Sequence, residues 1–229
     1  LSTEIIQLLE PKSTVAFLDK KIFFKSGHGR LKWRADTFHT EEPLMISWLE
    51  NFTKDDVFLD VGANVGTYSI PAGILAKKVI SIELDPINVY CLHTNIFLNN
   101  LQDKITILPL ACGNTKSIQE IFYRDFSMGD ALQSVGREQI LPTHKNKSFT
   151  MQQFTVTIDS LFEDYEIPTP TKIKIDVDGN EEIVLGGAWK TIAQAKEIYF
   201  EDNGLDSDTE ILAKFSDNLY NLLGTNHKI

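Results

Sequence analysis

Cysteine is scarce in this chain, because its 229 residues include only Cys91 and Cys112. Two cysteines form no disulfide framework, and a chain of this length can bury enough surface to be stable without one. Glycine and proline are also few, at 13 and 8 residues, which excludes collagen-like and low-complexity classes. We therefore expect an ordinary globular protein from a reducing compartment.

Long apolar runs are missing from the sequence as well. No stretch approaches the ~20 residues that a helix needs to cross a bilayer. Residues 1–21 contain Glu4 and Glu10 rather than a basic start followed by an apolar segment. We expect no membrane span, no signal peptide and a cytoplasmic location.

Basic residues are outnumbered by acidic ones, with 22 Lys and Arg against 32 Asp and Glu and a formal net charge of −10. Such a protein repels a phosphate backbone unless its basic residues cluster on one face. Nucleic acid is therefore not an expected partner. The sequence does not predict the oligomeric state.

From Val57 onwards, apolar runs typical of buried strands alternate with helical segments. The predicted strands are 57–61, 79–83, 105–108, 172–176 and 197–201. Helices are expected at about 69–76, 86–98, 182–195 and 212–223, the third weakened by two glycines. This alternation predicts an α/β fold with a doubly wound, mostly parallel sheet. Two more strands, 117–123 and 149–158, flank a polar loop and form an inserted strand pair.

No linker rich in Gly, Ser or Pro divides the chain. We expect one compact unit, with an N-terminal helical lead-in at residues 1–54 and the main domain at 55–229. Within the lead-in, Thr40-Glu41-Glu42-Pro43 is typical of a helix start.

The most informative motif is Asp60-Val61-Gly62-Ala63-Asn64-Val65-Gly66, between a predicted strand and a helix. Gly62 and Gly66 permit a sharp turn and close approach of a ligand, and N–H groups at a helix start favour an anionic group. The spacing differs from the G-x-G-x-x-G of dinucleotide sites, and Asp60 would repel a pyrophosphate. An amino acid, with an ammonium beside a carboxylate, suits this turn better.

A second acid, Glu83, ends the next predicted strand, 21 residues after Gly62. In this place a carboxylate can accept hydrogen bonds from two ribose hydroxyls. A nucleoside joined to an amino acid, in a negatively charged pocket, indicates S-adenosylmethionine. The alternative is that the glycines only close a tight turn and that Glu83 is a solvated strand end.

Seven residues are the candidate cofactor contacts: Asp60, Gly62, Asn64, Gly66, Glu83, Asp85 and Ala111. Asp85 also precedes Pro86, and this pair is typical of a helix cap and a first helical residue. Ala111 follows the third strand, where small residues would let adenine lie flat. Cys112 has no identifiable partner base and is not expected to be a nucleophile.

Three segments resemble the FkbM-type methyltransferases: VFLDVGANVG at 57–66, SIELDP at 81–86 and KIKIDVDGNEEIVLGGA at 172–188. The resemblance extends from about Arg34 to Asp202. It implies the class I fold of S-adenosylmethionine-dependent enzymes and O-methylation of a hydroxyl on a sugar, glycan or secondary metabolite. The chain departs from the pattern at Asn180, where many members have histidine, and in its short C-terminus.

Two carboxylates, Asp176 and Asp178, follow the predicted strand 172–176. Methyl transfer to a hydroxyl is helped by orientation of the reactants and by a base that removes the proton. We expect Asp176 to orient donor or acceptor and Asp178 to be the base. The alternative for Asp178 and Asn180 is capping of the next helix, and for Asn180 capping is the better interpretation.

No metal is expected. Asp176-x-Asp178-x-Asn180 starts like a calcium loop, but the sixth position is Glu181 instead of Gly and the twelfth is Gly187 instead of Glu. The histidines have no ligand spacing. The polar segment Phe126–Gly136 is a candidate lid over the acceptor, or else a surface loop.

Three other functions remain open. A nicotinamide-dependent oxidoreductase would share the doubly wound sheet, although Asn64 and the missing third glycine disfavour it. An amino methyltransferase of nucleic acids would need an Asn/Asp-Pro-Pro-aromatic turn where this chain has Asp176-Val177-Asp178-Gly179. A non-catalytic scaffold that binds S-adenosylmethionine is the third.

Overall fold

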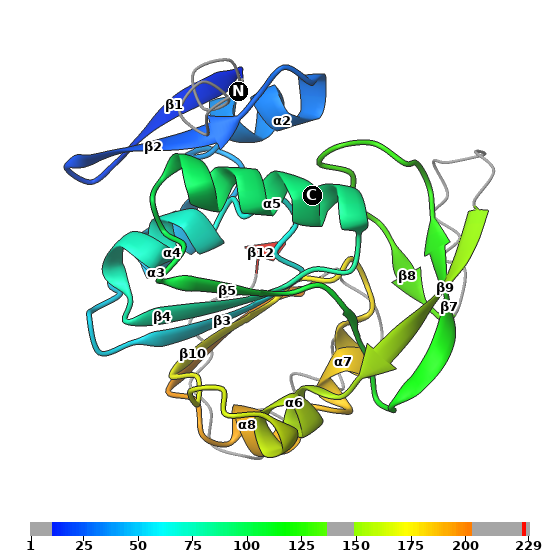
Figure 1. Cartoon of the computed structure of the whole chain (residues 1–229). Helices are drawn as coiled ribbons and strands as arrows, with labels where there is room; N and C mark the ends of the chain where they lie inside the picture. Colours follow the sequence, from blue (N-terminus) through cyan, green and yellow to red (C-terminus); the bar gives the residue numbers. More distant parts are fainter. Residues whose placement is uncertain (1–10, 137–148, 203–225, 228–229) are drawn as a thin grey trace.

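The structure, a computed structural model, describes residues 11–136, 149–202 and 226–227 (Figure 1). Its centre is a sheet in which every pair of neighbouring strands is parallel, in the order β12-β11-β10-β3-β4-β5. The strands are β3 (Val57–Val61), β4 (Lys78–Ile82), β5 (Ile105–Leu108), β10 (Lys172–Ile175), β11 (Glu197–Asp202) and β12 (Asn226–His227). The predicted α/β class and mostly parallel sheet are confirmed.

Strand order reverses at β3, because β4 and β5 extend the sheet on one side and β10 and β11 on the other. In open α/β sheets, ligands bind beyond the carboxyl ends of the strands at such a switch point. The turn after Val61 and the loop after Ile175 meet there. The backbone N–H of Asp176 donates to the carbonyl of Val61 over 3.1 Å.

Helices cover both faces of this sheet (Figure 1). On one face are α3 (Pro43–Leu49), α4 (Ser69–Leu75) and α5 (Pro86–Leu98), and on the other are α6 (Ile158–Asp164), α7 (Glu181–Leu185) and α8 (Trp189–Ile192). All five residues of β3 are buried, since successive side chains enter two different cores. Phe58 packs with α3, α4 and α5, whereas Leu59 packs with α6, α7 and α8.

The helix predicted at 182–195 is divided into α7 and α8. Gly186 and Gly187 lie at the break, and a Cβ on Gly187 would come within 2.4 Å of the carbonyl oxygen of Gly113. The backbone at position 187 can approach that of Gly113 only because residue 187 is glycine, and this glycine also interrupts the helix. The helix predicted at 212–223 lies outside the described residues.

A second sheet contains the predicted strand pair. β7 (Ser117–Tyr123) and β9 (Phe149–Val156) run antiparallel, and the short strands β6 (Ala111–Cys112) and β8 (Ser134–Val135) complete the order β6-β9-β7-β8. The inserted strand pair is confirmed, and β8 lies in the segment expected to be a loop or lid.

The lead-in is only partly helical. It contains α2 (Gly29–Asp36) and α3, but its described residues also include an antiparallel hairpin of β1 (Lys12–Phe17) and β2 (Lys20–Lys25) that the sequence did not predict. The hairpin is tied to α5, because the backbone N–H of Lys25 donates to the Asn95 side-chain oxygen over 2.6 Å. Phe17 and Ile22 share one core cluster with Phe58, so the lead-in packs directly on the main sheet.

Two smaller expectations concern helix ends and length. α3 begins at Pro43 as predicted, but Thr40 does not cap it, because the Thr40 hydroxyl donates to the carbonyl of Thr37. None of the helices in the described ranges combines the length and apolar character that a bilayer crossing demands.

Candidate active site

Two adjoining cavities lie at the switch point between β3 and β10. The larger has a volume of about 450 Å³ and the smaller about 50 Å³. Gly62, Asn64, Asp176 and Asp178 line both. Four of the nine residues that the sequence singled out therefore form the boundary between the two spaces.

The turn after β3 has the backbone geometry that its glycines permit. Gly62 has a φ of +78°, and a Cβ there would lie 1.9 Å from the carbonyl oxygen of Asp176. Gly66 has a φ of +86°, and its Cβ would lie 2.4 Å from Leu92 Cδ1. Gly62 lines the cavities, whereas Gly66 packs against α5 and shapes the turn from behind. Asn64 also has a positive φ, 51°, which asparagine tolerates better than most residues.

Glu83 is buried at the end of β4, beside this turn. Its Oε2 accepts a hydrogen bond from the backbone N–H of Asn64 over 2.7 Å, and its Oε1 accepts one from that of Asp85 over 2.8 Å. Burial raises the pKa of Glu83 to about 7, and the nearby carboxylates of Asp85 and Asp60 add to this increase. The two backbone hydrogen bonds act in the opposite direction and lower the pKa. Glu83 lines the smaller cavity, so it is not the solvated strand end that was the alternative interpretation.

The smaller cavity is a slot lined by three carboxylates, those of Glu83, Asp176 and Asp178. Its remaining walls are mostly apolar, formed by Val61, Ile82, Leu84, Leu110, Cys112, Val135, Val177 and Val184. Ala111, which lies between Leu110 and Cys112 in the chain, is fully buried and does not itself line the slot. Burial raises the pKa of the Cys112 thiol to about 12, which agrees with the expectation that it is no nucleophile.

Asp85 caps α5 as predicted, since its Oδ1 accepts a hydrogen bond from the Ile87 N–H over 2.8 Å. Its Oδ2 accepts a hydrogen bond from Gln133 Nε2 over 3.1 Å. Asp85 itself lines neither cavity, whereas Gln133 lines the slot. The position of Asp85 therefore supports an indirect role, in which it holds α5 and Gln133.

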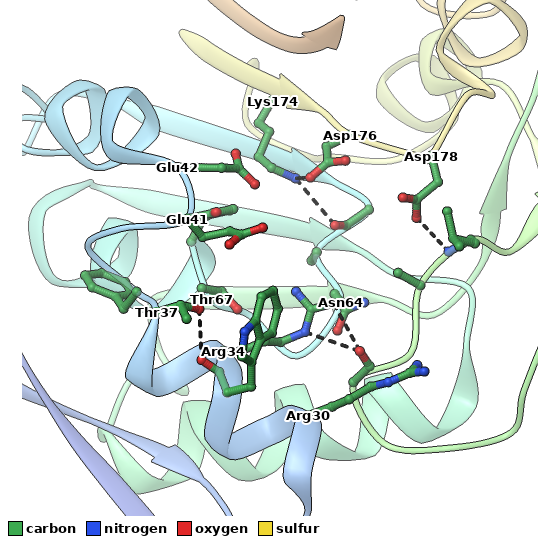
Figure 2. Close-up of a pocket in the computed structure, with 18 of the residues that line it drawn as sticks. Arg30, Arg34, Thr37, Glu41, Glu42, Asn64, Thr67, Lys174, Asp176 and Asp178 are labelled. Atoms are coloured by element: carbon green, nitrogen blue, oxygen red, sulfur yellow. Dashed lines mark hydrogen bonds and ion pairs between the residues drawn. The ribbon is translucent and has the colours of Figure 1, made fainter. Parts of the chain in front are cut away.

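Asp60 lies behind the turn, inside the protein. Its Oδ2 accepts a hydrogen bond from the Ser69 hydroxyl over 2.5 Å, and its Oδ1 is 3.4 Å from Lys174 Nζ. The same Nζ is 3.1 Å from Asp176 Oδ2 (Figure 2). Burial lowers the pKa of Lys174, but the nearby carboxylates, chiefly those of Asp176 and Asp60, together have a larger opposite effect, and the net pKa is raised. This lysine therefore stays charged. Lys174 and Asp176 reach the larger cavity, while Asp60 does not line it.

Asp178 has a φ of 53° in the loop after β10, next to Gly179 with a φ of 88°. Its Oδ2 accepts a hydrogen bond from the backbone N–H of Leu132 over 2.8 Å (Figure 2). Asn180 occupies the N-cap position of α7 without a side-chain cap bond. Its amide nitrogen instead donates to the carbonyls of Val177 and Gln133, over 2.9 and 3.3 Å. The loop after β10 is thus joined to the candidate lid.

The described part of the candidate lid forms a wall of both cavities. Gly129, Ala131 and Leu132 line the larger one, and Gln133 and Val135 line the slot. The Asn64 amide nitrogen donates to the carbonyl of Asp130 over 2.7 Å, and that of Asn88 donates to the same oxygen over 2.9 Å. The segment is therefore anchored to the glycine turn and to α5.

Several cavity residues were not singled out from the sequence. Residues of α2 and of the segment after it form one wall: Arg30, Trp33, Arg34, Thr37, Phe38, Glu41 and Glu42. Others come from the start of α4 and from the inserted region: Thr67, Tyr68 and Arg124. Positions 30, 33, 34 and 37 have the spacing of one helix face, and this spacing was the sequence signal that these side chains lie together. Nothing in the sequence showed that this face meets the carboxyl ends of β3 and β10.

Tyr68 lies beside Lys174, whose Nζ is 5.5 Å from the centre of its ring. Burial raises the pKa of the Tyr68 hydroxyl, and the carboxylates of Glu42 and Asp176 raise it further. This tyrosine therefore stays protonated, and its hydroxyl donates a hydrogen bond to the Glu42 side chain. Within the described ranges, no cluster of three or more His, Cys, Asp or Glu could hold a metal ion.

Among the curated proteins that match parts of this chain are two methyltransferases. AglP, a hexuronic acid methyltransferase of Haloferax volcanii, is 28% identical over 172 residues, which cover 74% of this chain and 65% of AglP. The ribosomal protein L11 methyltransferase of Carboxydothermus hydrogenoformans is 32% identical over 72 residues, which cover 31% of this chain and 24% of that enzyme. This chain therefore spans less than two thirds of the length of either relative.

The solved structure of the methyltransferase FkbM of Methylobacillus flagellatus KT aligns with a TM-score of 0.46 at 21% identity. The alignment covers 68% of this chain and 35% of that one. A family model for the methyltransferase FkbM domain matches residues 60–222, which include the glycine turn, Glu83 and the loop with Asp176 and Asp178. The resemblance seen in the sequence is thus confirmed, and the chain belongs to the FkbM methyltransferase domain family.

Proposed function

We propose that this protein is an S-adenosylmethionine-dependent O-methyltransferase that acts on a hydroxyl of a sugar, glycan or secondary metabolite. The observation that carries the proposal is the shared wall of the two cavities. A slot that contains Glu83 and a larger polar cavity meet at Gly62, Asn64, Asp176 and Asp178. A methyl donor in the slot and a methyl acceptor in the cavity would meet at these residues.

The residues present fit the donor. Each oxygen of Glu83 accepts one backbone N–H, and a carboxylate offers about four acceptor positions, which leaves two for ribose hydroxyls. The apolar walls at Leu110, Cys112 and Val184 suit adenine. The slot holds about 50 Å³, so its walls must open further to admit the donor.

The methionine part of the donor suits the acidic side of the larger cavity. Glu41, Glu42 and Asp176 lie there with Lys174 (Figure 2). Carboxylates stabilise a nearby ammonium and sulfonium, and the positive charge of Lys174 favours a carboxylate. Gly62 lets the backbone approach the donor closely, since no side chain intervenes.

When bound, S-adenosylmethionine supplies a methyl carbon that bonds to the acceptor oxygen as its bond to sulfur breaks. Asp178 would hold the acceptor hydroxyl and take its proton, because its carboxylate lies at the boundary of both cavities. Asp176 would orient the reactants while Lys174 holds it in place over 3.1 Å. The family match supports methyl transfer, and the name of AglP as a hexuronic acid methyltransferase supports a sugar acceptor.

The test is to incubate the protein with S-adenosylmethionine and a panel of neutral and acidic saccharides, and to measure S-adenosylhomocysteine. We expect turnover with at least one saccharide and methylation at oxygen in its product. Donor binding without turnover across the panel would favour the non-catalytic scaffold. Binding of a nicotinamide cofactor without binding of S-adenosylmethionine would favour the oxidoreductase.

A further inference from the structure

Helix α2 presents one face to the larger cavity. Arg30, Trp33 and Arg34 line it at the i, i+3, i+4 spacing that places side chains on one side of a helix. The opposite face is buried, with Leu31 packed against Val65 and Cys91. The core therefore fixes the direction in which Trp33 and Arg34 point.

The arginines around this cavity differ in how their charges are balanced. Arg30 and Arg124 both form ion pairs with the buried carboxylate of Asp130. The negative charges of Asp125 and Asp178 also interact with the Arg124 guanidinium. Arg30 and Arg124 are thus compensated by carboxylates.

Arg34 is the exception. Its Nη2 donates to the carbonyl of Gly129 over 3.0 Å and its Nε to the same oxygen over 3.3 Å. In the part of the chain that the structure describes, no ion pair is formed by Arg34. A guanidinium has five N–H donors, so Arg34 keeps donors and a full charge for a ligand in the cavity.

Trp33 provides a surface next to this charge. Its side chain lines the cavity and is 46% exposed, which is high for tryptophan. An exposed indole face binds the apolar C–H face of a sugar ring by burial of both surfaces. Trp33 and Arg34 thus combine a flat aromatic platform with an anion-binding guanidinium.

We propose that Trp33 and Arg34 form the acceptor subsite and that the acceptor is a saccharide bearing a carboxylate. The inference deepens the proposed function and rests on it. The ring stacks on Trp33, and the carboxylate binds Arg34. Figure 2 shows Asp176 and Lys174 across the cavity from Arg30.

Two matched probes test the subsite: methyl α-D-glucopyranosiduronate and methyl α-D-glucopyranoside, titrated by NMR into protein saturated with S-adenosylhomocysteine. We expect the uronide to bind at least tenfold more tightly than the glucoside. Arg34→Gln should abolish this difference, and Trp33→Ala should weaken both probes. Lys32→Gln is the control, because Lys32 is a cation on the same helix that pairs with Asp36 over 2.6 Å, outside the cavity.

Equal binding of the two probes to the wild type, or a preference that survives Arg34→Gln, would overturn the subsite. A second measurement excludes the carboxylate of the donor as the partner of Arg34. Calorimetry should give Arg34→Gln an affinity for S-adenosylhomocysteine within about twofold of the wild type, which also shows that the variant is folded. A loss of tenfold or more would assign Arg34 to the donor and overturn the proposal. A wild type that binds no S-adenosylhomocysteine would instead refute the proposed function.

Discussion

The backbone N–H of Asn64 donates a hydrogen bond to Oε2 of Glu83 over 2.7 Å. The glycine turn and the acid after β4 are therefore one unit, although 19 positions separate them in the chain. The carboxylate proposed to accept the ribose hydroxyls also holds the turn proposed to receive the methionine. Loss of Glu83 should affect both halves of the donor.

The affinity for the donor should depend on pH through Glu83. Burial raises the pKa of this carboxyl to about 7, and the ionised form is the one that accepts hydrogen bonds from the ribose. Below pH 7 most Glu83 carboxyls are protonated and must lose this proton before the donor binds. The affinity for S-adenosylhomocysteine should therefore fall by about tenfold from pH 8 to pH 6. Calorimetry at both pH values measures this.

Glu83→Gln is the control for the pH effect, because it removes the titrating group. It should weaken binding at pH 8 by about 1.5 to 3 kcal/mol, the range for hydrogen bonds to charged groups. Its remaining affinity should no longer depend on pH in this range. An equal pH dependence in Glu83→Gln would assign the effect to another group, such as Glu181, whose pKa burial also raises to about 7.

Gly62→Ala should abolish donor binding. The new Cβ would lie 1.9 Å from the carbonyl oxygen of Asp176, in a backbone conformation that disfavours alanine. Gly29→Ala is the matched control, because its Cβ would meet nothing within 4 Å. Calorimetry with S-adenosylhomocysteine should show no heat for the first variant and wild-type affinity for the second. Wild-type affinity in Gly62→Ala would place the donor elsewhere.

Asp178→Asn should lower kcat by about 10²- to 10⁴-fold, the usual contribution of a general base. The affinity for S-adenosylhomocysteine should stay the same, since asparagine can still accept the hydrogen bond from Leu132. Asp55→Asn, an exposed change just before β3, serves as the control. Turnover at the wild-type rate in Asp178→Asn would exclude Asp178 as the base.

Lys174→Met should destabilise the protein by about 3 to 5 kcal/mol, because it leaves the buried carboxylate of Asp60 without its cation. Asp60→Asn added to this variant should restore part of the loss. Lys190→Met is the control, since the Lys190–Glu163 pair is exposed and should contribute little. Urea unfolding measures all three, and an unchanged stability of Lys174→Met would contradict a structural role for the ion pair.

The sequence predicted β3, β4, β5, β10 and β11 of the main sheet because each is a short apolar run, but it did not predict β12. It did not predict the N-terminal hairpin. The turn joins Phe17 to Lys20 through Leu18 and Asp19, and Leu18 has a φ of 51°. Two-residue hairpins are usually recognised by Asn-Gly or Asp-Gly, and a leucine in this conformation gives no such signal.

The candidate site was predicted where residues follow strands and missed where tertiary packing decides. Gly62, Glu83 and Asp176 follow β3, β4 and β10, so the strand pattern alone places them at one edge of the sheet. Trp33 and Arg34 reach the cavity only because Leu31 anchors α2 against the body of the protein. No local pattern indicates which side of the sheet such a helix will meet.

The most direct test of this account is a crystal structure of the protein with S-adenosylhomocysteine. We expect the ribose to contact Glu83, the adenine to lie against Leu110 and Cys112, and the sulfur to face the cavity beside Asp176 and Asp178. Density for the ligand outside the two cavities, or saturating ligand without density, would contradict the account.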